Sequence, residues 1–441
     1  EQEESICLTE LQSSDAVVTP FHLLGFVDRN QDMLEYGERY SRQIAEKVPS
    51  SAIFSRYNTY VKPNDRIRIG YLSSDFGNHA TSMLLTEVLE RHDRSRFEVI
   101  GYCHSNDDGS ALRQRVISAF DRFESIEALG HREAAEKIHS DGVELLIDLK
   151  GYTKDARQEI LVQRPAPVQV NYLGYPATTG ADYIDYIVAD SIVAPMEHQC
   201  HYSERIVHLD ACYQPNDSLR RIDQSPVLRS DFGLPDEGFV FCSFNNNFKI
   251  NRQFFEIWMN LLEQVPRSVL WLLMKSPQMR INLEREASRR GVDPKRLIFA
   301  GQLPSDRHLA RHALADLFLD SLPCCAHTTA SDALWARLPI LTCIGPTFAG
   351  RVAASVLSAC NMPELITTSL DGYMSTALQL ARDRSRLDEL KVRLSANRDT
   401  APLYHTANYV RSLESAFERM SDLHRSGQRP ESFAVRDLNR L

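Results

Sequence analysis

Short apolar runs alternate with amphipathic segments over most of this chain. Each run is rich in Val, Ile, Leu, Phe or Tyr and too short for a buried helix, which is typical of strands covered on both faces. In the first half, the predicted strands are residues 66–72, 97–102, 143–148, 168–172 and 186–189. The predicted helices of that half are residues 81–92, about 110–120 and 132–140. This alternation predicts a parallel sheet with helices on both faces, and therefore an α/β fold.

The alternation pauses in a polar, Pro-containing stretch at residues 228–238 and then restarts. In the second half, the predicted strands are residues 239–242, 269–273, 297–299, 317–319 and 339–342. The predicted helices there are residues 252–264, 278–290 and 306–314, followed by a helix-rich tail at about 370–425. Doubly wound halves bind ligands at the carboxyl ends of their strands, so a cleft between the two halves is the expected active site.

The chain therefore divides into four predicted parts. Before the alternation starts, residues 31–48 have the spacing of an amphipathic helix, and a linker with Pro49 and Pro63 follows. The predicted parts are an N-terminal helical segment and linker (1–65), a Rossmann-like domain (66–228), a second Rossmann-like domain (229–403), and a C-terminal helix and tail (404–441).

The segment after the predicted strand 317–319 is the most informative part of the chain. His327, Thr328 and Thr329 follow a turn and stand at the predicted start of a helix, where backbone N–H groups lack partners and the helix dipole is positive. Such a helix start is a common phosphate site. Asp332 lies about one turn further on, near enough to accept a hydrogen bond from a sugar hydroxyl. An ordinary Thr-capped helix explains the same residues, so both interpretations stay open here.

In each half, one further polar loop follows the first strand. In the first half, the loop with Gly77 brings His79 to the strand end, where a histidine can act as a general base or orient a hydroxyl. In the second half, Asn246 and Lys249 suit a diphosphate, because amides donate and accept hydrogen bonds and lysine is a point charge. A capping histidine and a solvated lysine are the ordinary alternatives.

A third loop follows the predicted strand 168–172. It contains Gly174, Tyr175, Pro176 and Thr178, and we consider it a candidate contact for a sugar or an acceptor; an ordinary turn is the alternative. All of these segments follow strands and would lie at the same edge of their sheets. Together they indicate an anion-binding active site more strongly than any one of them does.

Composition narrows the range of functions. A formal net charge of −9 over 441 residues argues against a nucleic-acid partner. The 14 histidines do not stand at metal-ligand spacing and no Asp-x-Asp triplet occurs, so no metal site is predicted. No apolar run approaches the ~18 residues of a membrane span, and no membrane partner is expected.

The first residues of the chain and its cysteines indicate how the protein is processed and in which compartment it lies. The chain opens Glu1-Gln2-Glu3-Glu4, with neither Met nor a signal-peptide pattern, and we interpret it as a fragment or a processed product. Nine cysteines without a C-x-x-C pair suit a reducing compartment, so a cytoplasmic location is predicted.

Taken together, these segments resemble the catalytic region of the O-linked N-acetylglucosamine transferases and the related SPINDLY-type proteins. The resembling segments, in the order of that family, are 70–79 (GYLSSDFGNH), 151–154 (GYTK), 164–169 (RPAPVQ), 173–176 (LGYP), 268–273 (SVLWLL), and His327, Thr328 and Thr329 with Asp332. The resemblance implies a GT-B fold, in which two Rossmann-like domains face a central cleft. It also implies an inverting, metal-independent transfer of N-acetylglucosamine from UDP-N-acetylglucosamine to Ser or Thr hydroxyls of a protein or peptide acceptor.

The resemblance further implies roles for individual residues. It implies that Lys249 contacts the diphosphate, that Asp332 contacts the ribose, and that the helix start at 327–329 binds phosphate. It implies nucleotide-site positions for Asn246, His308 and Arg311. His79 matches a histidine proposed in that family as the catalytic base.

Two departures from the animal members touch the nucleotide site. Ser305 follows Pro304 where those members have a lysine, and Asn246 stands where they have a glutamine. Those members also carry tetratricopeptide repeats upstream, and no ~34-residue repeat occurs in this chain.

Other functions therefore stay open at this point. Similar scaffolds transfer fucose from a GDP-sugar to Ser or Thr, or glucose from a UDP-sugar to Asn. A nucleotide-sugar-binding scaffold without turnover is the alternative from another class. The sequence indicates neither the acceptor protein nor the oligomeric state.

Overall fold

A computed structural model of the chain describes residues 18–50, 54 and 66–435. Most of the predicted N-terminal polar segment and linker lies outside these residues. The described residues form two compact units, one within residues 1–218 and 405–441, the other made of residues 219–404. The second unit begins before the polar stretch at 228–238 in which a boundary is predicted, and the tail after residue 404 returns to the first unit.

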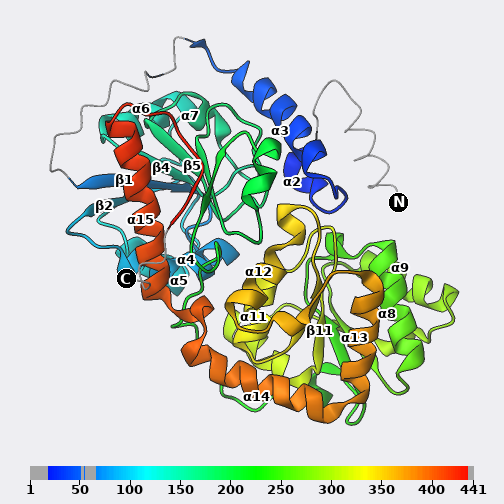
Figure 1. Cartoon of the computed structure of the whole chain (residues 1–441). Coiled ribbons are helices and arrows are strands. Elements are labelled where there is room, and N and C mark those ends of the chain that lie inside the picture. Colours follow the sequence, from blue (N-terminus) through cyan, green and yellow to red (C-terminus); the bar gives the residue numbers. More distant parts are fainter. Residues whose placement is uncertain (1–17, 51–53, 55–65, 436–441) are drawn as a thin grey trace. The chain divides into compact units, whose positions relative to one another are not determined.

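The first unit is built on an eight-stranded sheet with the order β14-β7-β6-β5-β4-β1-β2-β3 (Figure 1). Its strands are β1 (Ile67–Ser73), β2 (Phe97–Cys103), β3 (Arg122–Ser125), β4 (Leu145–Asp148), β5 (Val168–Asn171), β6 (Tyr186–Ala189), β7 (Arg205–His208) and β14 (Phe433–Ala434). Every pair is parallel. The five strands predicted in this half are confirmed, whereas β3, β7 and β14 were not predicted.

Helices cover this sheet on both faces, as the alternation predicts. They are α2 (Pro20–Leu23), α3 (Asn30–Ala45), α4 (Ala80–Arg91), α5 (Ala111–Ser118), α6 (His131–Ser140), α7 (Gln158–Val162) and α15 (Thr406–Arg425), with the 3-10 helix η2 (Met196–His201). The returning helix α15 belongs to the core of this unit, where Leu413, Phe417 and Met420 are fully buried against residues of the sheet and of α4.

The carboxylate of Glu87 binds the two segments of this unit that lead to and from the second unit. Glu87 on α4 is 1% exposed, and its Oε2 accepts hydrogen bonds from Ser218 N at 2.7 Å and from Thr406 Oγ1 at 2.7 Å. Arg91 Nε lies 2.7 Å from the other oxygen. Burial raises the pKa of Glu87, but the hydrogen bonds from Thr406, Ser218 and Arg91 outweigh it and leave that pKa below its ordinary value.

The second unit repeats the plan with a six-stranded sheet in the order β10-β9-β8-β11-β12-β13, again with every pair parallel. Its strands are β8 (Val240–Ser243), β9 (Val269–Leu273), β10 (Leu297–Ala300), β11 (Leu317–Leu319), β12 (Ile340–Cys343) and β13 (Ile366–Thr367). The five strands predicted here are confirmed, and the short β13 is additional.

Figure 1 shows α11 and α12 on one face of this sheet and α8 and α13 on the other. The helices are α8 (Arg252–Gln264), α9 (Pro277–Arg289), α10 (Ser305–Arg311), α11 (Thr328–Trp335), α12 (Val352–Ala359), α13 (Leu370–Arg382) and α14 (Arg384–Thr400). The 3-10 helices of this unit are η3 (Arg229–Phe232), η4 (Asn247–Lys249), η5 (Pro294–Arg296), η6 (His312–Leu314), η7 (Phe348–Gly350), η8 (Pro363–Leu365) and η9 (Pro402–Tyr404). Side chains of Asn251, Ser276, Ser369 and Asp383 accept hydrogen bonds from the first turns of α8, α9, α13 and α14, which defines where these helices begin.

The order of the strands locates one switch point in each sheet. In the first unit the chain runs outward from β1 to β2 and β3 and then returns to the other side of β1 with β4. In the second unit it does the same from β8, returning with β11. Ligands of doubly wound sheets bind at the carboxyl ends of the strands that flank such a point. These ends are β1 with β4 in one unit and β8 with β11 in the other.

Candidate functional site

At the switch point of the second unit, helix α11 begins with unpaired backbone donors. The N–H groups of Ala330 and Ser331 both donate to His327 O, at 2.9 and 3.3 Å. The N–H groups of Thr328 and Thr329 donate to no acceptor within the described part of the chain. Free amides and the positive end of a helix dipole are the features by which helix starts bind anions, and phosphate binding at this one stays a prediction.

A buried carboxylate fixes the loop that leads into this helix. Asp320 follows β11 and is fully buried, and its Oδ1 accepts hydrogen bonds from Ala326 N at 2.7 Å and Asn245 Nδ2 at 3.2 Å. Thr342 Oγ1 donates to its other oxygen at 2.8 Å. Burial raises the pKa of Asp320, and these donors oppose that rise. Sequence reasoning missed Asp320 as a site residue, although an acidic residue at the end of an apolar strand was a visible signal.

The strand β8 supplies the other half of this cluster. Asn245, which follows β8, accepts a hydrogen bond from Thr329 Oγ1 at 2.5 Å. Lys249 ends η4, and its Nζ donates to Cys325 O at 2.6 Å, so the lysine lies beside the turn that precedes α11. The structure therefore brings Lys249 together with the helix start, whereas the side chain of Asn246 is exposed.

His327 is held in its neutral form. Its Nε2 lies 3.0 Å from Ala349 O and therefore donates the hydrogen bond. Burial, assisted by the charge of Lys249, lowers the pKa of His327 to about 3. The imidazole at this position is consequently a fixed donor to the backbone and carries no charge at neutral pH.

His308 and Arg311 on α10 lie beside a buried aromatic pair. The Arg311 guanidinium is 4.8 Å from the ring centre of Phe244 and 5.8 Å from that of Trp271, and it donates to Gly301 O at 2.7 Å. Arg311 also lies 2.5 Å from His308 Nδ1. Burial, with smaller contributions from His312 and Arg311, lowers the pKa of His308 to about 2. A neutral imidazole beside an aromatic wall provides a flat surface suited to a planar ring.

Asp332 has a partner that sequence reasoning did not predict. Arg220 Nη1 lies 2.6 Å from Asp332 Oδ1, and both side chains are about nine-tenths buried. The Arg220-Arg221 pair is visible in the sequence, but nothing local indicates that one of the two arginines meets a helix far along the chain.

The switch point of the first unit carries His79. His79 is the N-cap of α4, and its Nδ1 accepts a hydrogen bond from Thr81 N at 3.3 Å and lies 3.5 Å from Asp75 Oδ2. Lys150, which follows β4, donates to both oxygens of Asp75 at 2.8 and 2.7 Å. Its side chain is only 4% exposed. The His79 side chain is 51% exposed. Its partial burial lowers the pKa of His79, Asp75 raises it and Lys150 lowers it, with a net shift downward.

The loop with Gly174 packs against the same strand end. A Cβ on Gly174 would lie 1.9 Å from Leu149 O, so only glycine allows this approach. Tyr175 and Pro176 are buried, and Thr178 Oγ1 donates to the buried Glu204 at 2.6 Å. These side chains stabilise the loop, and its contact with a sugar or an acceptor stays a prediction.

The described residues contain neither a metal-binding cluster nor a membrane-spanning helix. Within residues 18–50, 54 and 66–435, no group of three or more His, Cys, Asp or Glu side chains could hold a metal ion. No helix in that part of the chain is both long and apolar enough to cross a membrane.

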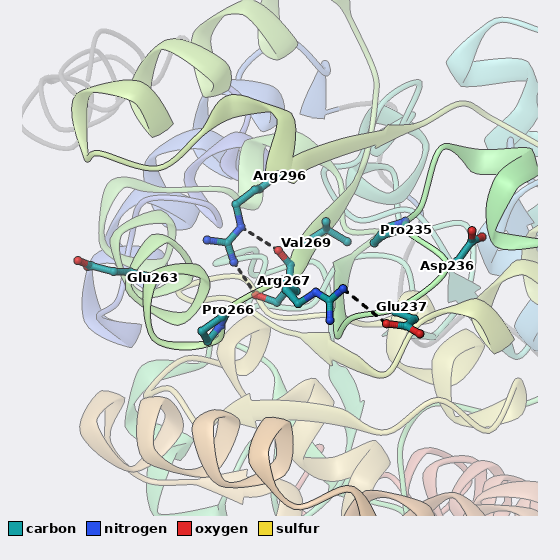
Figure 2. Close-up of a pocket in the computed structure, with 9 residues that line it drawn as sticks. Pro235, Asp236, Glu237, Glu263, Pro266, Arg267, Val269 and Arg296 are labelled. Carbon is teal, nitrogen blue, oxygen red and sulfur yellow. Dashed lines mark hydrogen bonds and ion pairs between the residues drawn. The ribbon is translucent and has the colours of Figure 1, made fainter.

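A surface hollow in the second unit lies away from these residues (Figure 2). It adjoins the start of β9 and includes Arg267, Arg296 and Glu237, and Arg296 Nε donates to Ser268 O at 2.9 Å. None of the predicted site residues lines it.

Comparison with known sequences agrees with these features. The sequence profile of glycosyl transferase family 41 matches residues 39–223 and 217–413. A probable UDP-N-acetylglucosamine--peptide N-acetylglucosaminyltransferase, SEC of Arabidopsis thaliana, is 40% identical over 376 residues, which cover 84% of this chain and 38% of that protein. The UDP-N-acetylglucosamine--peptide N-acetylglucosaminyltransferase of Caenorhabditis elegans is 29% identical over 479 residues, with 83% of this chain and 42% of that protein covered. The chain thus spans less than half the length of these relatives.

Solved structures give the same result. A mutant of the Thermobaculum terrenum O-GlcNAc transferase superposes with a TM-score of 0.82 at 28% identity, covering 96% of this chain and 78% of that one. Anabaena HepE, solved in complex with UDP and glucose, has a TM-score of 0.57 at 14% identity and covers 81% of this chain and all of that one, which supports the fold alone. From the fold, the two matching profile segments and these relatives, we conclude that the chain has a GT-B fold and belongs to glycosyl transferase family 41.

Proposed function

We propose that this chain is the catalytic part of an inverting transferase that moves N-acetylglucosamine from UDP-N-acetylglucosamine to Ser or Thr hydroxyls of a protein or peptide. The observation that carries the proposal is the start of α11, where the amides of Thr328 and Thr329 are free and Lys249 lies beside the preceding turn. The relatives named for this activity are longer than this chain, so the activity of the whole protein is part of the proposal.

The helix start suits the leaving group of such a transfer. Negative charge grows on the UDP diphosphate as the bond to the sugar breaks. Amide dipoles that are already oriented, together with one ammonium group, stabilise this charge without reorganisation. In this proposal Lys249 exchanges its bond to Cys325 O for the diphosphate, and neutralisation requires no metal ion.

The remaining residues of the second unit are assigned to the nucleoside. Asp332, in the second turn of α11, accepts a hydrogen bond from a ribose hydroxyl. His308 and Arg311 line the place of the base, which lies against the side of α10, and Asn246 contributes from the end of β8. These assignments are supported by the motif match and by the common position of these residues beside β8 and β11.

In the first unit, His79 is assigned to the acceptor hydroxyl. A hydroxyl is a weak nucleophile at neutral pH and benefits from a neutral imidazole that takes its proton or orients it. The downward shift of the His79 pKa keeps the imidazole neutral at pH 7. The loop from Gly174 to Thr178, at the neighbouring strand end, is assigned to the sugar or the acceptor.

A cytoplasmic setting is part of the proposal. All eight described cysteines are free thiols and seven of them are buried, which suits a reducing compartment.

The first test is a thermal-unfolding titration with UDP, GDP, UDP-N-acetylglucosamine and UDP-glucose, with EDTA present. A ligand that binds only the folded state stabilises it by about 2.7 kcal/mol at 100 times its Kd. We expect stabilisation by UDP and by UDP-N-acetylglucosamine, and none by GDP. Stabilisation by GDP alone would instead favour transfer from a GDP-sugar.

Turnover is tested separately, with radiolabelled UDP-N-acetylglucosamine or UDP-glucose and a mixture of peptides that contain Ser, Thr or Asn. Binding of UDP without transfer or hydrolysis would favour a nucleotide-sugar-binding scaffold. If glucose is transferred to Asn more readily than N-acetylglucosamine is transferred to Ser or Thr, UDP-glucose is the favoured donor.

A further inference from the structure

Two neighbouring arginines at the beginning of the second unit have very different environments. The Arg220 side chain is 8% exposed and its Nη1 lies 2.6 Å from Asp332 Oδ1, whereas Arg221 is exposed. Asp332 lies in α11, one turn past the free amides of Thr328 and Thr329. A buried charge on the connecting segment therefore meets a carboxylate that lies one turn past the start of α11.

The segment that carries Arg220 is attached to α10. Asp223 N donates to Asp306 O at 3.3 Å, and Arg307 Nε lies 3.4 Å from Asp223 Oδ2. The charge of Arg220 also contributes to the low pKa of His308 and His312, after burial and nearer groups. Arg220 thus lies among the residues assigned to the nucleoside and is held there by more than one contact.

The pairing with Arg220 leaves the other oxygen of Asp332 available. Oδ2 has no hydrogen-bond donor among the residues that the structure describes. A carboxylate that is nine-tenths buried is costly to keep charged without an opposite charge, and a neighbouring guanidinium offsets this cost and limits its rotation. An ionised carboxylate is an acceptor only, which suits a hydroxyl donor.

We propose that Arg220 is a positioning residue of the donor site, which holds the Asp332 carboxylate so that its Oδ2 accepts a hydrogen bond from a ribose hydroxyl. The inference rests on the proposed function and adds to it a residue outside the motifs that carry the family resemblance. Arg220 acts through Asp332 and need not touch the nucleotide.

The test measures recognition of the ribose hydroxyls by calorimetric titration. The probes are UDP, 2′-deoxy-UDP, 3′-deoxy-UDP and uridine. They are added to the wild-type chain and to the variants Arg220→Met, Arg220→Lys, Asp332→Asn and Arg220→Met with Asp332→Asn. Methionine preserves much of the volume and removes the charge, and thermal unfolding verifies that each variant is folded. Arg221→Met is the matched control, because it removes the neighbouring charge from an exposed position.

In the wild type we expect UDP to bind at least about 10-fold tighter than one of the deoxy analogues, as a hydrogen bond to a charged acceptor provides. Arg220→Met should lose most of this preference, Arg220→Lys should retain part of it, and Arg221→Met should retain all of it. The double variant should discriminate no worse than Asp332→Asn alone, because the two residues act as one unit.

Three results overturn the inference in different ways. If Arg220→Met binds UDP and keeps the wild-type preference, Arg220 does not position Asp332 and the proposed function is unaffected. If it loses affinity equally for UDP and both deoxy analogues but binds uridine normally, Arg220 contacts phosphate instead. If the wild type binds no UDP, the proposed function fails and the inference fails with it.

Discussion

Two neighbours compete for one ring nitrogen of His79. When Nδ1 accepts the hydrogen bond from Thr81 N, the neutral imidazole carries its proton on Nε2. When Nδ1 instead carries the proton and points it at Asp75, Nε2 becomes the acceptor. Nε2 has no partner within the described residues, and only the second tautomer can take a proton from a hydroxyl there. Asp75, held by Lys150, therefore favours the tautomer that a base requires.

The pH dependence of transfer should reveal this arrangement. Burial is the main cause of the lowered His79 pKa, Asp75 raises it and Lys150 lowers it. If neutral His79 is required, activity rises with pH through a pKa below its ordinary value of about 6.5. Lys150→Met should move this acidic limb of kcat/KM to higher pH, and Asp75→Asn should move it to lower pH. Lys154→Met is the exposed control, and an acidic limb that stays in place in both test variants would contradict the role of His79.

Lys249 gives a second prediction at this scale. Lys249→Ala removes the ammonium group beside the helix start together with its hydrogen bond to Cys325 O. We expect kcat/KM to fall by about 100-fold or more, as on removal of one stabilising donor at a developing anion. Thermal stability should change little, since one hydrogen bond contributes about 1 kcal/mol. Lys295→Ala, at an exposed position, is the control, and near-normal turnover of Lys249→Ala would exclude the diphosphate role.

At the scale of elements, the sequence predicts the strands whose positions are mostly buried. It does not predict edge strands with charged residues or contacts between loops that are distant in the chain. Most positions in the ten predicted strands are apolar, because helices cover both faces of each sheet. The strands β3 and β7 escaped prediction because residues such as Arg122, Glu124 and Arg205 interrupt short runs at or near the edge of the sheet. Ion pairs such as Lys150 with Asp75 join loops that are distant in sequence, and no local pattern reveals them.

The candidate site likewise contains residues that the sequence predicts and residues that only the folded structure shows. The helix start at His327, Thr328 and Thr329 could be predicted because strand, turn and helix follow one another in the sequence. Asp320 is visible in the sequence as an acidic residue at the end of an apolar strand, but its hydrogen bonds to Asn245, Ala326 and Thr342 appear only in the folded structure. Arg220 could not be predicted at all, because its burial depends on how the connecting segment packs on α10 and α11.

The packing of α3 on the loop that ends at Gly180 predicts how much stability a substitution of that glycine removes. Gly180 has φ +65°, and a Cβ there would lie 2.2 Å from the backbone N of Glu38 on α3. Gly109 has nearly the same φ, +66°, but nothing lies within 4 Å of its Cβ position. Gly109→Ala should therefore cost only the backbone strain, about 1 kcal/mol.

Gly180→Ala should cost a further 1–3 kcal/mol or so, because the backbone of α3 has to move. Chemical denaturation of the two variants measures the difference. Equal losses would mean that α3 does not constrain the loop. If α3 does constrain it, Gly180→Ala should also reduce transfer, since Thr178 lies in the same loop.

At the scale of the whole molecule, both sheets are built by the same rule and both carry their polar clusters at the switch point. Each cluster consists of residues from two strands that are neighbours in space and distant in the chain: β1 with β4, and β8 with β11. This repetition explains why motifs that are scattered over the sequence gather at one strand edge within each unit. Nothing in the sequence indicates that α15 packs in the core of the first unit. The pattern of an amphipathic helix shows which face is buried but not which part of the protein buries it.

The shared anchor on Glu87 makes the second unit an insert in the first. Since Ser218 and Thr406 bind the same carboxylate oxygen, the two ends that flank residues 219–404 are already neighbours. A few Gly and Ser residues between Ser218 and Thr406 would close the chain at little entropic cost. We expect such a shortened protein to unfold in one cooperative transition with the helix and strand content of the first unit, as circular dichroism would show. Loss of that transition would mean that the first unit depends on its insert; its retention would allow the insert to be exchanged for one that recognises a different nucleotide.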